Sequence, residues 1–239
     1  MIKSVVRRDF KKLDKNEEIS KIFGYLYGES PLPIIMDGKK PWGIIDERRL
    51  LKRKLSGNEK VKNFVVGVPK LDASYSIEKA REKMVEGGQP FIIVTYGGGL
   101  AGYITAVDIS IKIGVGKAGD MMKEVEPLNE NDSMATAINR LKQVNEAVLP
   151  VTKEDKFVGV IRIRDVLRLE TTHEKIRDYR SEKTSPLDAP VKGFMETGVR
   201  CVSPEAREEV IKIVDKQGFA IVCKNGEYMG IINMIDLIR

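Results

Sequence analysis

The chain has 239 residues, of which 42% are hydrophobic and 32% are charged, a composition that excludes an intrinsically disordered or membrane-embedded protein. Its 41 Lys and Arg residues outnumber 35 Asp and Glu residues, and the excess lies in residues 1–118, which carry 22 basic and 14 acidic side chains. The single histidine, His173, excludes a metal site built from several histidines and disfavours a histidine-based catalytic triad.

The predicted location of the protein follows from three further features. No apolar run approaches the roughly 18 residues of a membrane span, and the residues from Met1 to Asp9 lack the apolar stretch of a secretory signal. Cys201 and Cys223 lie 22 positions apart in apolar segments, without CxxC spacing, so we expect reduced core thiols rather than a disulfide or a metal site. These features predict a cytoplasmic protein that does not associate with membranes.

Amphipathic helices are predicted at four places along the chain. Apolar residues recur there at three-to-four spacing. The four stretches are residues 17–27, 76–86, 132–144 and 205–217. Ser203 and Pro204 predict the start of the fourth helix, as N-cap and first helical residue, while Gly87-Gly88 and Gly218 predict helix ends.

Each of these helices precedes an apolar run, a polar turn and a second apolar run that contains or begins with a glycine. The four run-turn-run segments are residues 33–43, 91–102, 149–159 and 220–230. Asp37-Gly38 and Asn225-Gly226 are typical hairpin turns, and the β-branched residues around them favour buried strands. The anchoring glycines, Gly43, Gly102, Gly159 and Gly230, recur at intervals of 59, 57 and 71 residues. A second helix follows each, so the repeating unit is predicted to be β-α-β-β-α, an α/β fold.

A unit of this size is expected to be stable only when paired with a neighbour. We therefore expect a first pair at residues 1–118, with repeats 1–58 and 59–118, and a second pair at residues 119–239, with repeats 119–170 and 188–239. Residues 171–187 would connect the last two repeats, with a helical turn at 174–180.

Three of the glycines open a shared motif, Gly-apolar-apolar-x-x-x-Asp. The matching stretches are Gly102-Tyr-Ile-Thr105-Ala-Val-Asp108, Gly159-Val-Ile-Arg162-Ile-Arg-Asp165 and Gly230-Ile-Ile-Asn233-Met-Ile-Asp236. With this fourfold recurrence the sequence resembles, over nearly its whole length, the CBS-domain family, named after cystathionine β-synthase, whose tandem pairs are called Bateman modules. The first repeat departs from the motif because Arg49 stands where the others have Asp.

The resemblance implies a ligand. Tandem repeats of the family bind AMP, ADP, ATP or S-adenosylmethionine in clefts between paired sheets, and the family's Gly-x-x-[Ser/Thr]-x-x-[Asp/Asn] stretch places a hydroxyl on the phosphate and a carboxylate on the ribose. Only the second repeat has both parts, at Thr105 and Asp108. Asp165 in the third repeat, and Asn233 and Asp236 in the fourth, match the motif less fully.

The residue chemistry supports the same site without the family. Thr105 would end a strand at a helix N-terminus, where the helix dipole favours an anion, and Asp108 could accept two hydrogen bonds from a ribose cis-diol. An acid in a first helical turn also stabilises the helix without any ligand. We favour the binding role for Asp108, and both interpretations remain open for Asp165 and Asp236.

Arginines stand at the motif positions of the other two repeats. In repeat 3, Arg162 replaces the hydroxyl and could hold a phosphate or simply fill the cleft. In repeat 1, Arg49 cannot accept from a ribose, although Arg48 and Arg49 could reach a phosphate in the neighbouring cleft.

The glycine-rich stretch 97–102 satisfies GxGxxG, the pattern of a dinucleotide-binding turn. That turn must open a helix, whereas Tyr103 and Ile104 continue as a strand, so we reject the Rossmann interpretation.

The leading hypothesis is a non-catalytic sensor whose two pairs change their relative orientation when an adenosyl ligand binds. An alternative is a binder of nucleic acid or of a partner protein through the basic N-terminal half, for which residues 48–54 are a candidate. An enzyme related to IMP dehydrogenase is disfavoured because the chain has no room for a barrel domain with its reactive cysteine loop. We also expect a homodimer.

Overall fold

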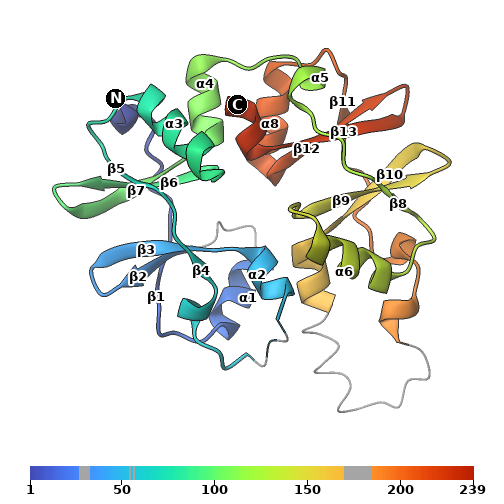
Figure 1. The fold of residues 1–239 in the computed structure, drawn as a ribbon, viewed down its shortest axis with the longest axis horizontal. Helices are drawn as coiled ribbons and strands as arrows, with labels where there is room; N and C mark the ends of the chain where they lie inside the picture. The colour runs from blue at the N-terminus through green and yellow to red at the C-terminus, as the bar shows by residue number, and fades with distance from the viewer. Residues whose placement is uncertain (27–32, 54, 56, 170–184) are drawn as a thin grey trace.

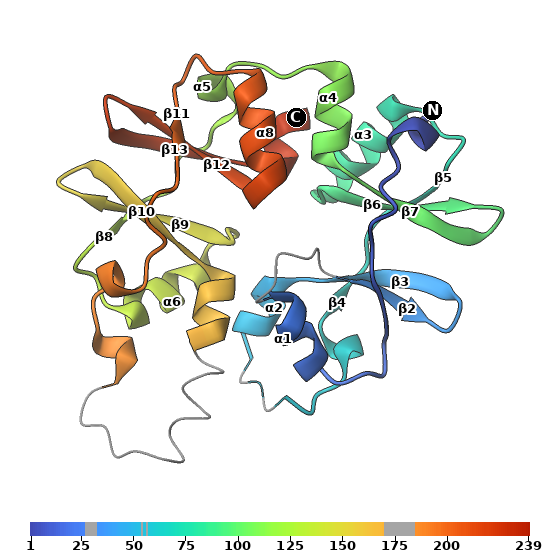
Figure 2. The same cartoon turned by 180° about the vertical axis from the view of Figure 1, so that it is seen from behind.

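Four copies of one β-α-β-β-α unit make up the computed structural model, which describes residues 1–26, 33–53, 55, 57–169 and 185–239. Figure 1 shows the copies as four lobes in a ring, in the order repeat 1, repeat 2, repeat 4, repeat 3. The view from behind gives the same arrangement (Figure 2). The predicted fold class, α/β with four such repeats, is confirmed.

The helices and strands fall into four matching sets. Repeat 1 has β1 (Lys12–Asp14), α1 (Ser20–Leu26), β2 (Ile34–Asp37), β3 (Lys40–Ile45) and α2 (Glu47–Leu51). Repeat 2 has β5 (Lys70–Asp72), α3 (Ile77–Gly87), β6 (Phe91–Tyr96), β7 (Gly99–Thr105) and α4 (Ala106–Ile113). Repeat 3 has β8 (Leu128–Asn129), α6 (Met134–Gln143), β9 (Val148–Lys153), β10 (Lys156–Arg162) and helical residues 163–169. Repeat 4 has β11 (Cys201–Val202), α8 (Glu208–Gln217), β12 (Phe219–Lys224), β13 (Glu227–Asn233) and the 3₁₀ helix η5 (Met234–Ile238).

Short elements join the repeats. They are η1 (Ile2–Val5), η2 (Val61–Asn63), β4 (Val65–Val66), α5 (Ala118–Met121), η3 (Pro186–Asp188) and η4 (Val191–Gly193). His173 and the helical turn predicted at 174–180 lie outside the described residues, as does most of the predicted connector.

Most of the predicted helix ends are confirmed by their caps. Ser76 accepts a hydrogen bond from the N–H of Lys79 at the start of α3, and Gly88 adopts the left-handed conformation at its end. Gly218 ends α8 in the same way. Asn225 and Gly226 both have positive φ, as a tight hairpin turn requires.

The predicted start of the fourth helix is wrong. Ser203 and Pro204 form a separate turn, and α8 begins only at Glu208. The carbonyl oxygens of Pro204 and Ala206 accept from the N–H groups of Gly119 and Ala118 at 2.8 and 2.7 Å. Because α5 uses these carbonyls, a helical turn through them would leave its donors without partners.

The strands of the described residues form three sheets. Their orders are β1-β2-β3-β4, β5-β6-β7 and β11-β12-β13-β10-β9-β8. Within each repeat the first strand runs parallel to the second, and the last two form an antiparallel hairpin. The glycine-rich stretch 97–102 leads into β7, which confirms that it opens a strand and not a helix.

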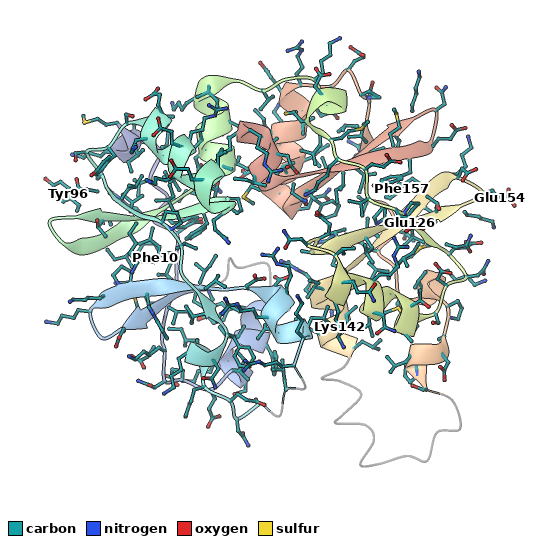
Figure 3. The ribbon with its side chains drawn as sticks, viewed as in Figure 1. Phe10, Tyr96, Glu126, Lys142, Glu154 and Phe157 are labelled. Carbon is teal, nitrogen blue, oxygen red and sulfur yellow. A yellow bond between two sulfur atoms is a disulfide. The ribbon has the colours of Figure 1, made fainter. Side chains whose placement is uncertain are left out.

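Each repeat contributes to two hydrophobic cores. Sheet residues of repeats 1 and 2 pack around Ile34 and Ile93, and those of repeats 3 and 4 around Val160 and Ile231. Figure 3 shows Phe10 in the first of these layers and Phe157 in the second. The helices pack in the other direction, repeat 2 against repeat 4 and repeat 1 against repeat 3. The ring is thus closed by two sheet layers and two helix layers.

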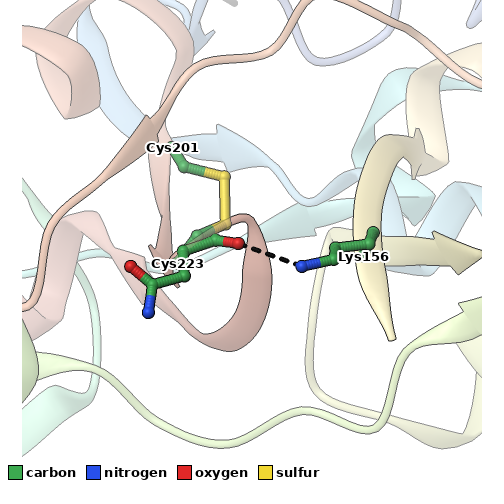
Figure 4. Close-up of a disulfide and its surroundings, with 4 residues drawn as sticks. Lys156, Cys201 and Cys223 are labelled. Carbon is green, nitrogen blue, oxygen red and sulfur yellow. Dashed lines mark hydrogen bonds between the residues drawn. A yellow bond between two sulfur atoms is a disulfide. The ribbon is translucent and has the colours of Figure 1, made fainter. Parts of the chain in front are cut away.

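The two cysteines do not follow the prediction of reduced thiols. Cys201 in β11 and Cys223 in β12 form a disulfide, with their Cα atoms 5.5 Å apart (Figure 4). Because Cys201 pairs in register with Ile221 in the parallel strand, Cys223 is its next neighbour on the same face. This pairing between strands was not visible from the spacing of 22 residues alone.

None of the helices in the described part of the chain is long and apolar enough to cross a bilayer.

Candidate functional site

A segment from the neighbouring repeat crosses each anchoring glycine. At Gly102 the crossing residue is Arg7, whose N–H donates to the carbonyl oxygen of Tyr103 at 2.8 Å, while its own carbonyl oxygen accepts from the N–H of Tyr103 at 3.1 Å. A methyl group on Gly102 would collide with the carbonyl oxygen of Arg7 and with the side chain of Val6. The close approach of two backbones therefore requires this glycine.

The same approach occurs in the other repeats. A Cβ atom on Gly159 would lie 2.6 Å from the carbonyl oxygen of Glu196, and one on Gly230 would lie 2.8 Å from that of Lys123. The four crossing pairs are Arg7 on Gly102, Val66 on Gly43, Lys123 on Gly230 and Glu196 on Gly159. Repeats 1 and 2 thus exchange their N-terminal segments, and so do repeats 3 and 4.

Thr105 and Asp108 of repeat 2 form a capping box at the start of α4. The hydroxyl and the N–H of Thr105 donate to Oδ2 of Asp108 at 2.9 and 2.8 Å, and the N–H of Asp108 donates to Oγ1 of Thr105 at 3.4 Å. The two residues are buried, with 7% and 9% of their surface exposed. The structure therefore brings the predicted pair together at a helix N-terminus.

The guanidinium of Arg7 binds the same carboxylate. Its Nε lies 2.8 Å from Oδ1 and 2.9 Å from Oδ2 of Asp108, and its Nη2 donates to Asp215 in α8 at 2.7 Å. Burial alone would lower the pKa of Arg7, but the hydrogen bonds to Asp215 and Asp108 outweigh this effect and raise it. Oδ2 of Asp108 accepts both bonds from Thr105, and Nε of Arg7 is shared between Oδ2 and Oδ1. Three donors therefore occupy three of the roughly four lone-pair positions of this carboxylate.

Repeat 4 has a related arrangement. The N–H of Asn233 donates to Oδ2 of Asp236 at 2.8 Å, and Arg239 donates to Oδ1 at 3.0 Å. The side-chain amide of Asn233 donates to Glu146 of repeat 3 at 2.6 Å, and the ammonium of the crossing Lys123 lies 2.8 Å from Glu146 and 3.7 Å from Asp236. The polar groups of this site are therefore bound to one another.

Repeat 3 reverses the charges. Its crossing residue is the acidic Glu196, which pairs with Arg162, and the guanidinium also lies 5.3 Å from the ring centre of Phe219. Nε of Arg162 and Oδ2 of Asp165 are buried and have no hydrogen-bond partner within the described chain. Burial raises the pKa of Asp165, against the opposing charge of Arg162. Arg162 thus binds a carboxylate of its own chain at this site.

Repeat 1 has neither the acid of the motif nor a charged crossing residue. Arg48 donates from Nε and Nη2 to the carboxylate of Asp46, both at 2.9 Å, and reaches the side chain of Asn145 in repeat 3. Arg49 donates to the carbonyl oxygen of Val65 at 3.1 Å. Both arginines that were predicted to reach a phosphate are therefore bound within the chain.

The predicted residues lie at four separate helix starts and do not form one site. Sequence reasoning missed the crossing residues Arg7, Lys123 and Glu196. A pattern that could have found them exists, since Arg7, Val66 and Lys123 follow one another at 59 and 57 residues, the intervals of the first three glycines. No three His, Cys, Asp or Glu side chains converge as a metal site anywhere in the described chain.

Fold and site together define a protein of tandem β-α-β-β-α repeats with exchanged N-terminal segments and capped helix starts. Residues 115–171 match the family model of the CBS domain, and these residues include the described elements of repeat 3 as far as residue 169.

Solved structures share this fold over the whole chain. Protein MJ1225 from Methanocaldococcus jannaschii, described as a putative archaeal homolog of g-AMPK, aligns with a TM-score of 0.79 at 14% identity, covering 98% of this chain and 97% of that one. An uncharacterized conserved protein from Pyrococcus horikoshii aligns with a TM-score of 0.66 at 19% identity, covering 99% and 97%. No curated protein matches the sequence.

Proposed function

We propose that the chain is a non-catalytic regulatory protein that binds an adenine nucleotide or a related adenosyl ligand in repeat 2. The observation that carries this proposal is the group formed by Thr105, Asp108 and Arg7, in which Thr105 and Arg7 both donate hydrogen bonds to the carboxylate of Asp108. A carboxylate suits a ribose cis-diol, and a hydroxyl and a guanidinium suit a phosphate. The shared fold with a described homolog of g-AMPK agrees with this ligand class.

The output of such a sensor is a change between the two pairs, which we assign to residues 1–118 and 119–239. A ligand shifts this equilibrium only if it binds one arrangement better than the other. Arg7 offers a connection, because it contacts Asp108 in repeat 2 and Asp215 in repeat 4.

The remaining predicted residues are secondary candidates. Five of them bind another residue of the chain, namely Asn233, Asp236, Arg162, Arg48 and Arg49. The sixth, Asp165, lies beside the ion pair of Arg162. A ligand at these places would have to replace such a contact, so we expect weaker binding there than in repeat 2.

The expected homodimer is kept as a proposal. Helix layers join repeat 1 to repeat 3 and repeat 2 to repeat 4 within one chain, so these helix faces are already covered. A dimer would need another surface, and light scattering of the purified protein measures whether one forms.

Calorimetry tests the proposed function. The full chain is titrated with AMP, ADP, ATP and S-adenosylmethionine, and so are Asp108→Ala and the matched control Asp165→Ala at the equivalent position of repeat 3. Loss of a hydrogen bond to a charged group predicts a roughly tenfold or greater loss of affinity in Asp108→Ala, and little change in the control. Unchanged affinity in Asp108→Ala would reject the site, and hydrolysis of ATP by the purified protein would reject the non-catalytic role.

A second candidate function, binding of a polyanion such as nucleic acid, is favoured by one surface of repeat 1. A groove of about 410 Å³ beside the β2–β3 turn is lined by Lys12, Leu13, Asp14, Met36, Gly38 and Lys39. The paired substitution of Lys12 and Lys39 by Glu would abolish such binding, and added salt would weaken it steeply. Binding that survives Asp108→Ala but not the lysine substitutions would establish this function.

A further inference from the structure

Arg7 cannot leave the site of repeat 2 as a whole residue. Its backbone pairs with Tyr103 through two hydrogen bonds of 2.8 and 3.1 Å, and its carbonyl oxygen lies directly over Gly102. Its side chain, in contrast, can exchange one hydrogen-bond acceptor for another. The guanidinium therefore stays near Asp108 whether or not a ligand is bound.

While Arg7 is bound to it, Asp108 has one open acceptor position, on Oδ1, which is too few for a ribose diol that donates two hydrogen bonds. Thr105 takes two positions on Oδ2, and Nε of Arg7 lies against both oxygens. A diol that donates two hydrogen bonds has to displace at least one of these donors. Arg7 is the donor that can move, because the contacts from Thr105 belong to the cap of α4.

A displaced Arg7 needs a new acceptor. Its side chain is 28% exposed and, without Asp108, keeps a carboxylate only at Asp215. A partly buried guanidinium without an anion on one side is unfavourable. A phosphate on the 5′ carbon of the ribose supplies that acceptor. Adenosine has a neutral hydroxyl at this place, and S-adenosylmethionine has a positively charged sulfonium, which adds repulsion.

From this exchange we infer that Arg7 determines which adenosyl ligands enter repeat 2, admitting those that carry a phosphate and excluding the cationic S-adenosylmethionine. This inference rests on the proposed function and narrows it to nucleotides. In repeat 4 the corresponding cation is Lys123, whereas repeats 1 and 3 have Val66 and Glu196 at the crossing position. Within the described chain, repeats 2 and 4 are the two with a basic crossing residue, and only repeat 2 combines it with a hydroxyl.

The test compares AMP, adenosine and S-adenosylmethionine on the wild type, Arg7→Ala and Arg7→Lys. Lys112→Ala is the control, since it removes an exposed positive charge from the end of the same helix. The wild type is expected to prefer AMP over adenosine, and Arg7→Ala to reduce that preference about tenfold, the effect of one charge-assisted hydrogen bond. Adenosine and S-adenosylmethionine should bind Arg7→Ala at least as well as the wild type, because Oδ1 of Asp108 then has no donor and can accept from the ribose. Arg7→Lys should restore part of the preference, and Lys112→Ala should keep all of it.

The outcomes separate this inference from the proposed function. If Asp108→Ala abolishes binding but Arg7→Ala keeps the wild-type ratio of AMP to adenosine, only the inference is overturned. A parallel loss of affinity for all three ligands in Arg7→Ala assigns Arg7 a structural role and also overturns it. If none of the three ligands binds the wild type, the proposed function fails and the inference with it. Unfolding midpoints are measured on every variant to identify any that does not fold. If Arg7→Ala does not fold, the ratio of AMP to adenosine affinity is compared between the wild type and Arg7→Lys instead.

Discussion

Repeats 2 and 3 place the same backbone beside opposite charges. In both, a segment from the neighbouring repeat crosses a glycine and puts one side chain at the start of the second helix. In repeat 2 that side chain is Arg7, which binds an acid of the motif, and in repeat 3 it is Glu196, which binds the arginine that replaces the motif's hydroxyl residue. The repeat backbone is therefore constant, while the crossing residue decides what each site can accept.

The difference also appears in how well each site satisfies its own polar groups. Both carboxylate oxygens of Asp108 accept hydrogen bonds, from Thr105 and from Arg7. One carboxylate oxygen of Asp165, in contrast, is buried and accepts no hydrogen bond within the described chain. Asp108 can bind a ligand reversibly by exchanging the hydrogen bond from Arg7 for one from the ligand. Asp165 is less suited to reversible binding, because it is already unpaired beside the ion pair of Arg162 and Glu196. We therefore expect the two repeats to respond differently to equivalent substitutions.

The largest expected effect comes from the crossing itself. Gly102→Ala should lower the free energy of unfolding by about 3 kcal/mol, because a backbone carbonyl cannot move aside as a side chain can. Gly159→Ala should lower it by somewhat less, since its Cβ atom would be 2.6 Å from Glu196 but otherwise meets the flexible side chain of Met195.

Chemical denaturation of these two variants and of Gly193→Ala, where an added Cβ meets no atom within 4 Å, gives the comparison. A wild-type midpoint for Gly102→Ala would contradict the close approach.

The disulfide distinguishes the second pair of repeats from the first. Replacing Cys201 and Cys223 by Ser opens a loop of 22 residues and should cost about 3 kcal/mol of stability in the oxidised protein. Under a strong reductant the wild type should unfold at nearly the denaturant concentration of the double variant. Equal stability of wild type and double variant under oxidising conditions would mean that the two thiols are not linked in the protein.

The next largest expected effect is a difference in stability between variants that lack the crossing side chain of repeat 2 or of repeat 3. Arg7→Ala leaves the buried Asp108 short of a donor and should cost about 2 kcal/mol. Glu196→Ala should cost less than about 1 kcal/mol, because Glu196 is 43% exposed and Arg162 can turn towards Asp165. Thermal unfolding of both variants at one pH measures the difference, and the reverse order would show that the charge at the crossing does not control the site.

The smallest expected effect concerns Asp165. Its pKa is raised in the folded protein by burial, so the folded state holds this proton more tightly than the unfolded state does. Stability contributed by this group is present at low pH and is lost as the pH rises through the raised value, so ionised Asp165 is unfavourable at neutral pH.

Asp165→Asn should therefore be as stable as the wild type or more so at neutral pH. It should also lose less stability as the pH rises above about 4, the range in which an ordinary Asp ionises. The exposed Asp155→Asn on the β9–β10 turn is the control. A clear loss of stability in Asp165→Asn at neutral pH would show that the carboxylate has a favourable partner.

The fold was largely predictable from the sequence because its determinants are local. Alternating apolar runs, hairpin turns and helix caps act over a few residues, and four copies of one pattern confirm each other. The start of α8 was not predictable in this way, since the carbonyls that would continue Ser203 and Pro204 into a helix are bound by α5, about 85 residues earlier in the chain.

The candidate site was predictable only in part. Thr105 and Asp108 stand three positions apart in one segment, so their proximity follows from the helix that they cap. The contact between Arg7 and Asp108 spans 101 residues and depends on the exchange of N-terminal segments. The glycine at each crossing was visible as a repeat, but the strand that lies over it was not. The disulfide between Cys201 and Cys223 was not predicted either, because it depends on the register of two paired strands that are distant in the sequence.

A crystal structure of the full chain grown with AMP tests the central claim most directly. The account predicts density for the nucleotide in repeat 2, with the ribose hydroxyls on Asp108 and the phosphate against a guanidinium of Arg7 that has turned away from that carboxylate. An occupied crevice elsewhere in the ring, with the Arg7–Asp108 ion pair intact, would contradict it.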